Sequence, residues 1–157
     1  TPAQTVNWVS EAMAHDLREG RFITLFMAEL DVKHHTLQNA NAGHAPALIF
    51  KAESRRCVYL SSTGLPLGFS DDLPCQAGER HDIAPGDVLV LATDGLIERK
   101  NPVGEYYGSA RLEAAIQSVF DRKAEQIVEA IKQSLAEFAG TRPPDDDLTL
   151  VVIRRTG

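Results

Sequence analysis

Two apolar runs that adjoin aspartates constrain this chain more than any other feature of its sequence. The first run, residues 88–92, leads directly into a Thr-Asp-Gly sequence at 93–95. The second run, residues 148–153, follows three consecutive aspartates at 145–147. Short runs rich in valine, leucine and isoleucine are typical of buried strands. Each pattern therefore predicts a carboxylate at a strand end, with its backbone held by the sheet and its oxygens free at the rim.

These carboxylates, Asp94 and the aspartates at 145–147, predict a site for a hard divalent cation. Mg²⁺ and Mn²⁺ prefer carboxylate and other oxygen ligands, and strand ends hold such ligands in fixed positions. An acidic residue in a single turn more often serves only to keep that turn solvated. The occurrence of two such motifs in one chain favours the metal site over this simpler interpretation.

The charge and the length of the apolar runs argue against several classes of partner. A formal charge of −6 and a pI near 5.3 argue against a general nucleic-acid binder, which needs a basic face. No basic run exceeds two residues, so an anionic membrane surface is an equally poor partner. The apolar runs are also far shorter than the ~20 residues that span a bilayer.

The two cysteines, Cys57 and Cys75, are predicted to be free thiols in a reducing cytoplasm. Residues 1–20 lack the basic-then-apolar pattern of a secretory signal. Two cysteines also make no disulfide framework of the kind that small secreted proteins use. Neither cysteine has the spacing of a metal ligand.

Local patterns predict a single α+β domain over residues 1–157, with a strand-rich middle and two late helices. Thr1 and Pro2 predict the start of a helix that stops near Gly20. The last strand is almost continuously apolar, which predicts burial on both faces, deep in the sheet. The expected strands are 22–30, 37–42, 47–50, 57–60, 79–83, 87–92 and 148–153; residues 61–78 are expected to be mostly loop, 95–98 a helical turn, 109–119 a helix capped by Ser109, and 123–139 an amphipathic helix.

Six segments, in this order along the chain, resemble motifs of the metal-dependent protein phosphatases (PPM, protein phosphatase 2C-like), specifically of their SpoIIE-type branch. Each motif is weak alone, and the specificity comes from finding all six in the family's order. The segments are Phe22-Ile23-Thr24-Leu25, Asn41-Ala42-Gly43-His44-Ala45-Pro46-Ala47-Leu48, Gly64-Leu65-Pro66-Leu67-Gly68, Pro85-Gly86-Asp87-Val88-Leu89, Thr93-Asp94-Gly95-Leu96-Ile97-Glu98 and Asp146-Asp147-Leu148-Thr149.

The resemblance implies a β-sandwich of two mostly antiparallel sheets flanked by helices, with a centre of two Mg²⁺ or Mn²⁺ ions at one end. Asp94 and Asp146 would be metal ligands, Gly95 would keep the backbone close to the site, and Asp147 would lie beside it. Asp145 falls outside the matching motif. The implied activity is hydrolysis of phosphoserine or phosphothreonine by a metal-activated water. The implied substrate is a phosphorylated regulatory protein, such as an anti-sigma factor antagonist.

The chain departs from the family pattern at its amino-terminal side. A Gly-Asp strand and an Asp-Val-x-Gly-His-Gly turn of the family, which supply at least one further metal ligand, have no match before Phe22. The chain therefore resembles the carboxy-terminal two-thirds of the domain, without its first strands. We expect weak metal binding and little turnover from this segment alone. An unpaired strand edge and exposed apolar surface also predict a homodimer.

Other polar residues have simpler interpretations. The histidines show no metal-ligand spacing, and His44 in its Gly-His turn is given a structural role. Glu98 is either a carboxylate near the metal site or a residue of a surface helix. Residues 101–107 are expected to be a mobile flap facing the substrate. The histidines are His15, His34, His35, His44 and His81, and the arginine pairs interpreted as solvated charge are Arg55-Arg56 and Arg154-Arg155.

Two alternatives to the phosphatase remain open. The first is a phosphatase-like regulatory module that binds a partner and lacks part of its catalytic site. The second is an unrelated α+β domain that binds a small molecule. The two acidic motifs favour the enzyme, whereas the missing upstream ligands favour the regulatory module.

Overall fold

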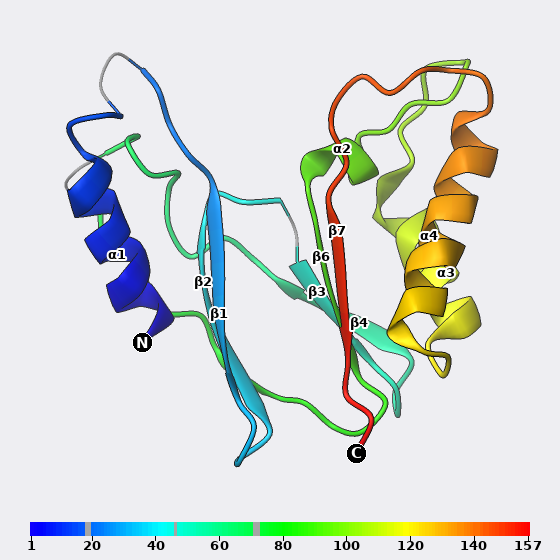
Figure 1. Ribbon diagram of the computed structural model, residues 1–157, viewed down its shortest axis with the longest axis horizontal. Helices are drawn as coiled ribbons and strands as arrows, with labels where there is room; N and C mark the ends of the chain where they lie inside the picture. Colours follow the sequence, from blue (N-terminus) through cyan, green and yellow to red (C-terminus); the bar gives the residue numbers. More distant parts are fainter. Residues whose placement is uncertain (18–19, 46, 71–72) are drawn as a thin grey trace. The chain divides into compact units, whose positions relative to one another are not determined.

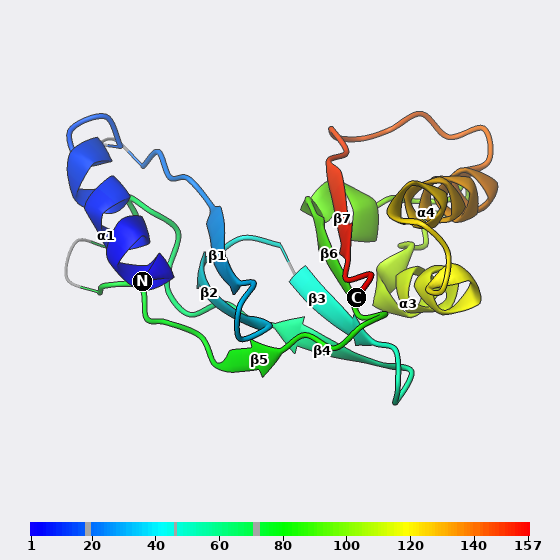
Figure 2. The same cartoon turned by 60° about the horizontal axis from the view of Figure 1, so that its bottom comes forward.

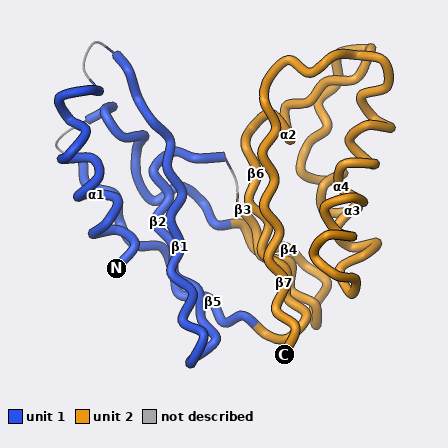
Figure 3. Tube along the Cα trace, in the orientation of Figure 1, with its two compact units in different colours: residues 1–45, 60–83 blue, residues 46–59, 84–157 orange. Residues whose placement is uncertain are grey.

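The structure is a computed structural model that describes residues 1–17, 20–45, 47–70 and 73–157. It divides into two compact units, of which unit 1 comprises residues 1–45 and 60–83, and unit 2 residues 46–59 and 84–157 (Figure 3). The described chain contains a three-stranded and a four-stranded antiparallel sheet together with helices (Figure 1). The prediction of an α+β fold with two antiparallel sheets is confirmed.

Unit 1 contains helix α1 (Pro2–Met13) and the sheet β1-β2-β5. Strands β1 (Leu25–Asp31) and β2 (Thr36–Ala42) form the predicted antiparallel hairpin, in which Leu25 pairs with Ala42 and Asp31 with Thr36. The short strand β5 (Arg80–Asp82) pairs with the other edge of β2. Asn41 of the Ala-Gly-His segment contacts the Gly-x-Pro-Leu-Gly segment in this unit, since its carbonyl accepts the Gly64 N–H at 3.1 Å. Pro46 of the first segment lies outside the described residues.

Helix α1 starts as predicted but ends earlier. The Thr1 hydroxyl and the Gln4 side chain form a capping box, and Pro2 occupies the first turn. The helix ends at Met13, and turns follow in which the Ala14 N–H donates to the Glu11 carbonyl and the N–H groups of Asp16 and Leu17 donate to the Met13 carbonyl. The expected end near Gly20 is therefore wrong.

Unit 2 contains a four-stranded sheet in the order β4-β3-β6-β7. Helices α3 and α4 lie side by side against this sheet (Figures 1 and 2). Their apolar residues, among them Ile116, Ile127 and Ile131, form one core with residues of the sheet such as Phe50 and Val90. The remaining bounds are β3 (Ala47–Lys51), β4 (Arg56–Leu60), β6 (Val88–Ala92), α2 (Asp94–Ile97), α3 (Gly108–Val119), α4 (Ala124–Ala139) and β7 (Leu150–Arg154).

Strand β7 is not the deeply buried strand that its sequence predicted. It lies at the edge of the sheet and, among the described strands, pairs with β6 alone. Leu150 and Val152 pack against the core, whereas Val151 and Ile153 are 45% and 48% exposed. Successive side chains of a strand point to opposite faces, and an apolar run alone does not determine whether both faces are covered.

The late helices agree with the prediction in place and in their apolar faces. The capping role expected of Ser109 is wrong, because α3 begins at Gly108 with Tyr107 at the N-cap position and without a side-chain cap.

Both cysteines are free, as predicted. Within the described residues, no helix combines the length and the apolar character that crossing a membrane requires.

Candidate metal centre

The two acidic motifs lie at the same end of the β6–β7 pair. Asp94 is the first residue of α2, directly after β6. The aspartates 145–147 precede β7, and the pairing of Ala92 with Leu150 brings the end of β6 to the start of β7 (Figure 1). We expected from the sequence that the two motifs meet at one edge of the sheet. The antiparallel register of these strands brings them together there.

Thr93 joins the two motifs through three hydrogen bonds. Its N–H donates to the Thr149 carbonyl at 3.1 Å, and its hydroxyl accepts the Thr149 N–H at 3.0 Å. The same hydroxyl donates to the Asp147 carbonyl at 3.3 Å. Although Thr93 is the N-cap residue of α2, its hydroxyl does not cap that helix. No role was predicted for Thr93 from the sequence, although its place beside Asp94 in the motif was a signal.

Gly95 allows the backbones of the two motifs to approach closely. A Cβ atom on Gly95 would lie 2.5 Å from the Asp147 carbonyl oxygen and 3.7 Å from the Asp146 Cβ. Its φ is not among the positive values of the chain. Glycine is therefore required here because there is no space for a side chain, and not because of its backbone conformation. This agrees with the expectation that Gly95 keeps the backbone close to the site.

Replacing Gly95 with alanine should weaken Mn²⁺ binding by about tenfold, a loss typical of displaced groups around metal ligands. The added methyl group would push the Asp147 carbonyl away and move Asp146 with it. Overpacking of this kind should also lower the free energy of unfolding by about 1–3 kcal/mol. Calorimetric titration with Mn²⁺ and urea denaturation measure the two effects.

Gly64→Ala is a matched control in unit 1. Its Cβ would lie 2.8 Å from the Cys75 Cα, so a similar loss of stability is expected. Its Mn²⁺ affinity should stay that of the wild type because Gly64 lies outside the unit that holds Asp94 and Asp146. A Gly95→Ala protein with unchanged Mn²⁺ affinity would contradict the proposed position of the metal.

The Asp94 and Asp146 carboxylates are exposed and held in similar ways. One oxygen of Asp94 accepts the Gly95 N–H at 3.0 Å, and one oxygen of Asp146 accepts the Asp147 N–H at 2.7 Å. Among described residues, the second oxygen of each carboxylate makes no hydrogen bond. These two oxygens fit a hard cation such as Mg²⁺ or Mn²⁺.

The site offers fewer acidic groups than a complete centre needs. In the described part of the chain, no three side chains of the histidine, cysteine, aspartate or glutamate type are grouped to hold a metal ion. Asp145 forms an ion pair with Arg142 at 3.1 Å. Asp147 contributes its carbonyl to the contact with Thr93. The geometry thus brings together two carboxylates that could contribute to a cation site.

A hollow of about 80 Å³ lies beside Asp146. Its acidic lining residues are Glu98, Asp145 and Asp146, so Glu98 lies near the candidate centre. Two cationic side chains for which no role was predicted, Arg99 and Lys100, line the same hollow. Their signal in the sequence was adjacency to the Thr-Asp-Gly motif.

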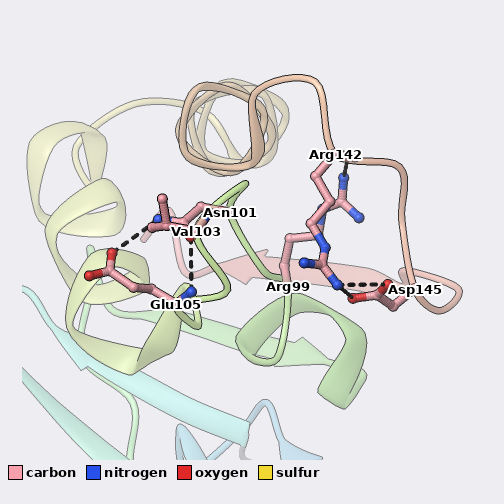
Figure 4. Close-up of polar contacts among 6 residues, drawn as sticks. All are labelled: Arg99, Asn101, Val103, Glu105, Arg142 and Asp145. Carbon is pink, nitrogen blue, oxygen red and sulfur yellow. Dashed lines mark hydrogen bonds and ion pairs between the residues drawn. The ribbon is translucent and has the colours of Figure 1, made fainter.

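Residues 101–107, expected to be a flap, belong to a hydrogen-bonded hairpin (Figure 4). The Asn101 N–H donates to the Glu105 carbonyl at 3.0 Å, and the Tyr107 N–H donates to the Arg99 carbonyl at 2.8 Å. The Asn101 side-chain oxygen accepts the N–H groups of Val103 and Glu105. The segment therefore has a defined shape next to the hollow, and its mobility stays a prediction.

The histidines belong to unit 1, whereas Asp94 and Asp146 belong to unit 2. The His44 N–H donates to the Asn41 side-chain oxygen at 2.8 Å, and the His44 ring lies 3.2 Å from the Thr24 hydroxyl. These contacts agree with the structural role expected of His44. His34 hydrogen-bonds to Asp31 at 2.7 Å, which lowers the pKa of the Asp31 carboxyl.

Raised pKa values occur away from the carboxylates, where β4 meets α3. Burial, aided by the charge of Glu113, raises the pKa of the Cys57 thiol to about 11. Burial and the hydrogen bond to Glu113 raise the pKa of Tyr59 to about 12. Because the thiolate is the reactive form of cysteine, Cys57 is a poor nucleophile at neutral pH.

The arginine pairs include contacts within unit 2. Arg55 lies 5.7 Å from the centre of the Phe120 ring, and Arg154 donates to the Phe120 carbonyl at 3.0 Å. These interactions occur at the turn after α3. Both arginines therefore have contacts with Phe120 within unit 2, and these contacts add no support for phosphate binding by Arg55 or Arg154.

Comparison with known proteins identifies relatives along almost the whole chain. A family model described as "Stage II sporulation protein E (SpoIIE)" matches residues 1–156. "Phosphoserine phosphatase RsbU" of Bacillus subtilis (strain 168) is 28% identical over 154 residues, which are 98% of this chain and 45% of RsbU. The chain therefore spans less than half the length of this relative.

Solved structures share the fold. The "SiaA-PP2C domain of Pseudomonas aeruginosa" matches with a TM-score of 0.84 and 22% identity, over 98% of this chain and 60% of that one. The Mn-presoaked "Phosphatase Domain of the Cell Fate Determinant SpoIIE from Bacillus subtilis" matches with a TM-score of 0.69 and 15% identity, over 98% of this chain and 64% of that one. The two antiparallel sheets and their helices thus agree with structures of this type.

Proposed function

Because the chain belongs to the SpoIIE family, the SpoIIE-type branch of the metal-dependent protein phosphatases, we propose that it forms part of a protein serine/threonine phosphatase domain. The observation that carries this proposal is the contact between the two acidic motifs, made by Thr93 with Thr149 and by Gly95 with Asp147. Membership of this family overturns the alternative of an unrelated domain that binds a small molecule.

The proposed substrate is phosphoserine or phosphothreonine on a regulatory protein, such as an anti-sigma factor antagonist. The name of RsbU, a phosphoserine phosphatase, supports this class of substrate. Phosphate monoesters hydrolyse extremely slowly without a catalyst, in part because the phosphate dianion repels an incoming hydroxide. The domain must therefore supply positive charge and an activated water.

Asp94 and Asp146 are proposed to hold Mg²⁺ or Mn²⁺ with the oxygens that face away from their neighbouring N–H groups. Two such ions in a complete centre would supply a water of lowered pKa and charge to offset that of the phosphoryl oxygens. Thr93 keeps the two carboxylates at the same rim by holding the backbone of both motifs. The chain itself supplies positioning and oxygen ligands, and it needs no covalent nucleophile.

A second candidate function is a phosphatase-like regulatory module without turnover. It is favoured by one observation, that no group of three metal-binding side chains occurs among the described residues. Such a module would bind a phosphorylated partner and leave its phosphate in place. The first function requires further ligands beyond Asp94 and Asp146, whereas the second does not.

The test of the proposed function is phosphate release from a phosphoserine peptide by the natural protein that carries this chain. We expect turnover that depends on Mn²⁺ or Mg²⁺. In an Asp146→Asn variant it should fall by more than about 100-fold. Disturbing only the groups that orient a metal ligand already costs 10- to 100-fold, and loss of the ligand itself should cost more. The 157-residue chain alone should show little turnover of para-nitrophenyl phosphate.

Three results would contradict parts of this proposal. Turnover that survives chelation of divalent ions would exclude the metal-dependent mechanism. Robust turnover by the 157-residue chain alone would show that its site needs no further ligands. Binding of the phosphopeptide by the natural protein without release of phosphate would establish the regulatory module in place of the enzyme.

A further inference from the structure

The hollow beside Asp146 is lined by charges of both signs. Arg99 and Lys100 line the same space as Glu98, Asp145 and Asp146, and Asp145 is paired with Arg142. Two cationic side chains next to a bound divalent ion would repel it, and they would weaken a site that served the cation alone. An anion between them and the metal would turn this repulsion into attraction. The lining therefore suits a cation and an anion bound together.

Arg99 is held in place yet keeps a donor unused. One of its terminal nitrogens donates to the Arg142 backbone carbonyl, and Arg142 in turn donates to Asp145 (Figure 4). The other terminal nitrogen, Nη1, is buried and has no hydrogen-bond partner among described residues. A buried N–H without a partner is costly, and an oxyanion is the acceptor that a guanidinium binds most strongly.

Lys100 also carries a charge that is not neutralised. Within the part of the chain that the structure describes, its ammonium forms no ion pair, and it lies 5.1 Å from the centre of the Tyr106 ring. Tyr106 lines the hollow as well, and the two residues form a backbone bridge. The ammonium has three donors and no acceptor, so it too lacks an anionic partner.

Hydrogen bonds of the hairpin give a defined shape to the backbone that carries these two cations. The Tyr107 N–H to Arg99 carbonyl bond closes its base, and the Asn101 side chain closes its tip through Val103 and Glu105. A preformed arrangement loses less entropy when a ligand binds. The hollow of about 80 Å³ has room for a small ligand such as an oxyanion, since a cavity needs only ~10–15 Å³ of this kind of space to hold one water molecule.

We propose that Arg99 and Lys100 form an anion subsite that receives the phosphoryl group of the substrate beside Asp146. The inference rests on the proposed phosphatase function and names residues of this chain that would bind the reacting group. The chemistry recognised is a phosphate dianion, either on a phosphoserine side chain or as the free product. No bond is made or broken by Arg99 or Lys100 in this role.

The test is calorimetric titration of the natural protein that carries this chain with inorganic phosphate and, in a second arm, with O-phosphoserine, at fixed ionic strength and with Mg²⁺ present. Lys100→Gln removes the charge and keeps most of the side chain. We expect it to raise the dissociation constant of both ligands by about tenfold, the loss of one hydrogen bond to a charged group. The Mg²⁺ dissociation constant, titrated without phosphate, should fall or stay the same, because a charge that repels the ion has been removed.

Lys132→Gln is the matched control, because Lys132 is exposed on α4 and pairs with Glu129 outside the hollow. Its affinities for phosphate and O-phosphoserine should equal those of the wild type. Equal phosphate affinity in Lys100→Gln and wild type, or no phosphate binding by the wild type, would overturn the subsite. Weaker binding of free phosphate but not of O-phosphoserine would overturn its role with substrate. Failure of the wild type to bind Mg²⁺ would instead count against the proposed function.

Discussion

Replacing Asp94 with asparagine should raise the dissociation constant for Mn²⁺ by about 100-fold or more. Disturbing only the groups that orient a metal ligand already costs 10- to 100-fold, and this change removes the charge of a proposed ligand. The carboxylate is exposed at the start of α2 and accepts one hydrogen bond, from the Gly95 N–H. An asparagine oxygen can still accept that bond, so the fold should remain intact.

Calorimetric titration with Mn²⁺ of the wild type and the variant measures this effect. Asp121→Asn is the matched control, since Asp121 is exposed and its contact is a 3.7 Å ion pair with the neighbouring Arg122. The control should bind Mn²⁺ like the wild type. Equal heats for Asp94→Asn and wild type would remove Asp94 from the site and, with it, the main support for a metal centre at this rim.

Replacing Asp87 with alanine should lower the free energy of unfolding by about 3 kcal/mol, the range for breaking a buried ion pair. The Asp87 side chain is 1% exposed. Its oxygens accept the N–H groups of Ala52 and Ala84, both at 2.9 Å, and the ammonium of Lys51. Alanine would remove the acceptor of these two backbone N–H groups and the buried partner of the Lys51 ammonium.

Urea denaturation followed by circular dichroism measures this loss as a fall in midpoint of about 1–2 M. Asp87→Asn keeps one acceptor oxygen and should lose about half as much stability, whereas the exposed Asp121→Ala should change it by less than about 0.5 kcal/mol. A midpoint for Asp87→Ala equal to that of Asp121→Ala would show that these hydrogen bonds do not stabilise the native state.

Asp87 also shows what a family motif does not reveal about its residues. The Pro-Gly-Asp-Val-Leu segment was recognised from the sequence, and Asp87 stood there between a turn and a strand without a role. The structure connects it to the turn after β3 and to the turn before β6, which lie about 35 residues apart in the chain. Motif recognition located the residue, and the bond from Ala84 is local, but only the fold brought Lys51 and Ala52 to it.

The strands and late helices were predictable because their signals are local. The apolar runs at 47–50 and 88–92 became β3 and β6 within one residue of their expected bounds. The stripe of Ile127, Ile131 and Leu135 placed α4 in the same way. The predicted end of α1 near Gly20 was wrong, because the turns after Met13 compete with the helix in a manner that side-chain spacing does not express.

By itself the sequence determined the α+β class, the order of the family motifs and the choice of Asp94 and Asp146 as candidate metal ligands. These properties reside in short stretches, where periodicity, turn residues and residue type act directly on the backbone. Only the tertiary structure decided that β7 lies at an edge, that the Thr93 hydroxyl bridges to Asp147 and Thr149, and that Arg99 and Lys100 share a hollow with Asp146. Each of these depends on pairing between segments about 50 residues apart, and no local preference specifies which distant group a side chain will meet.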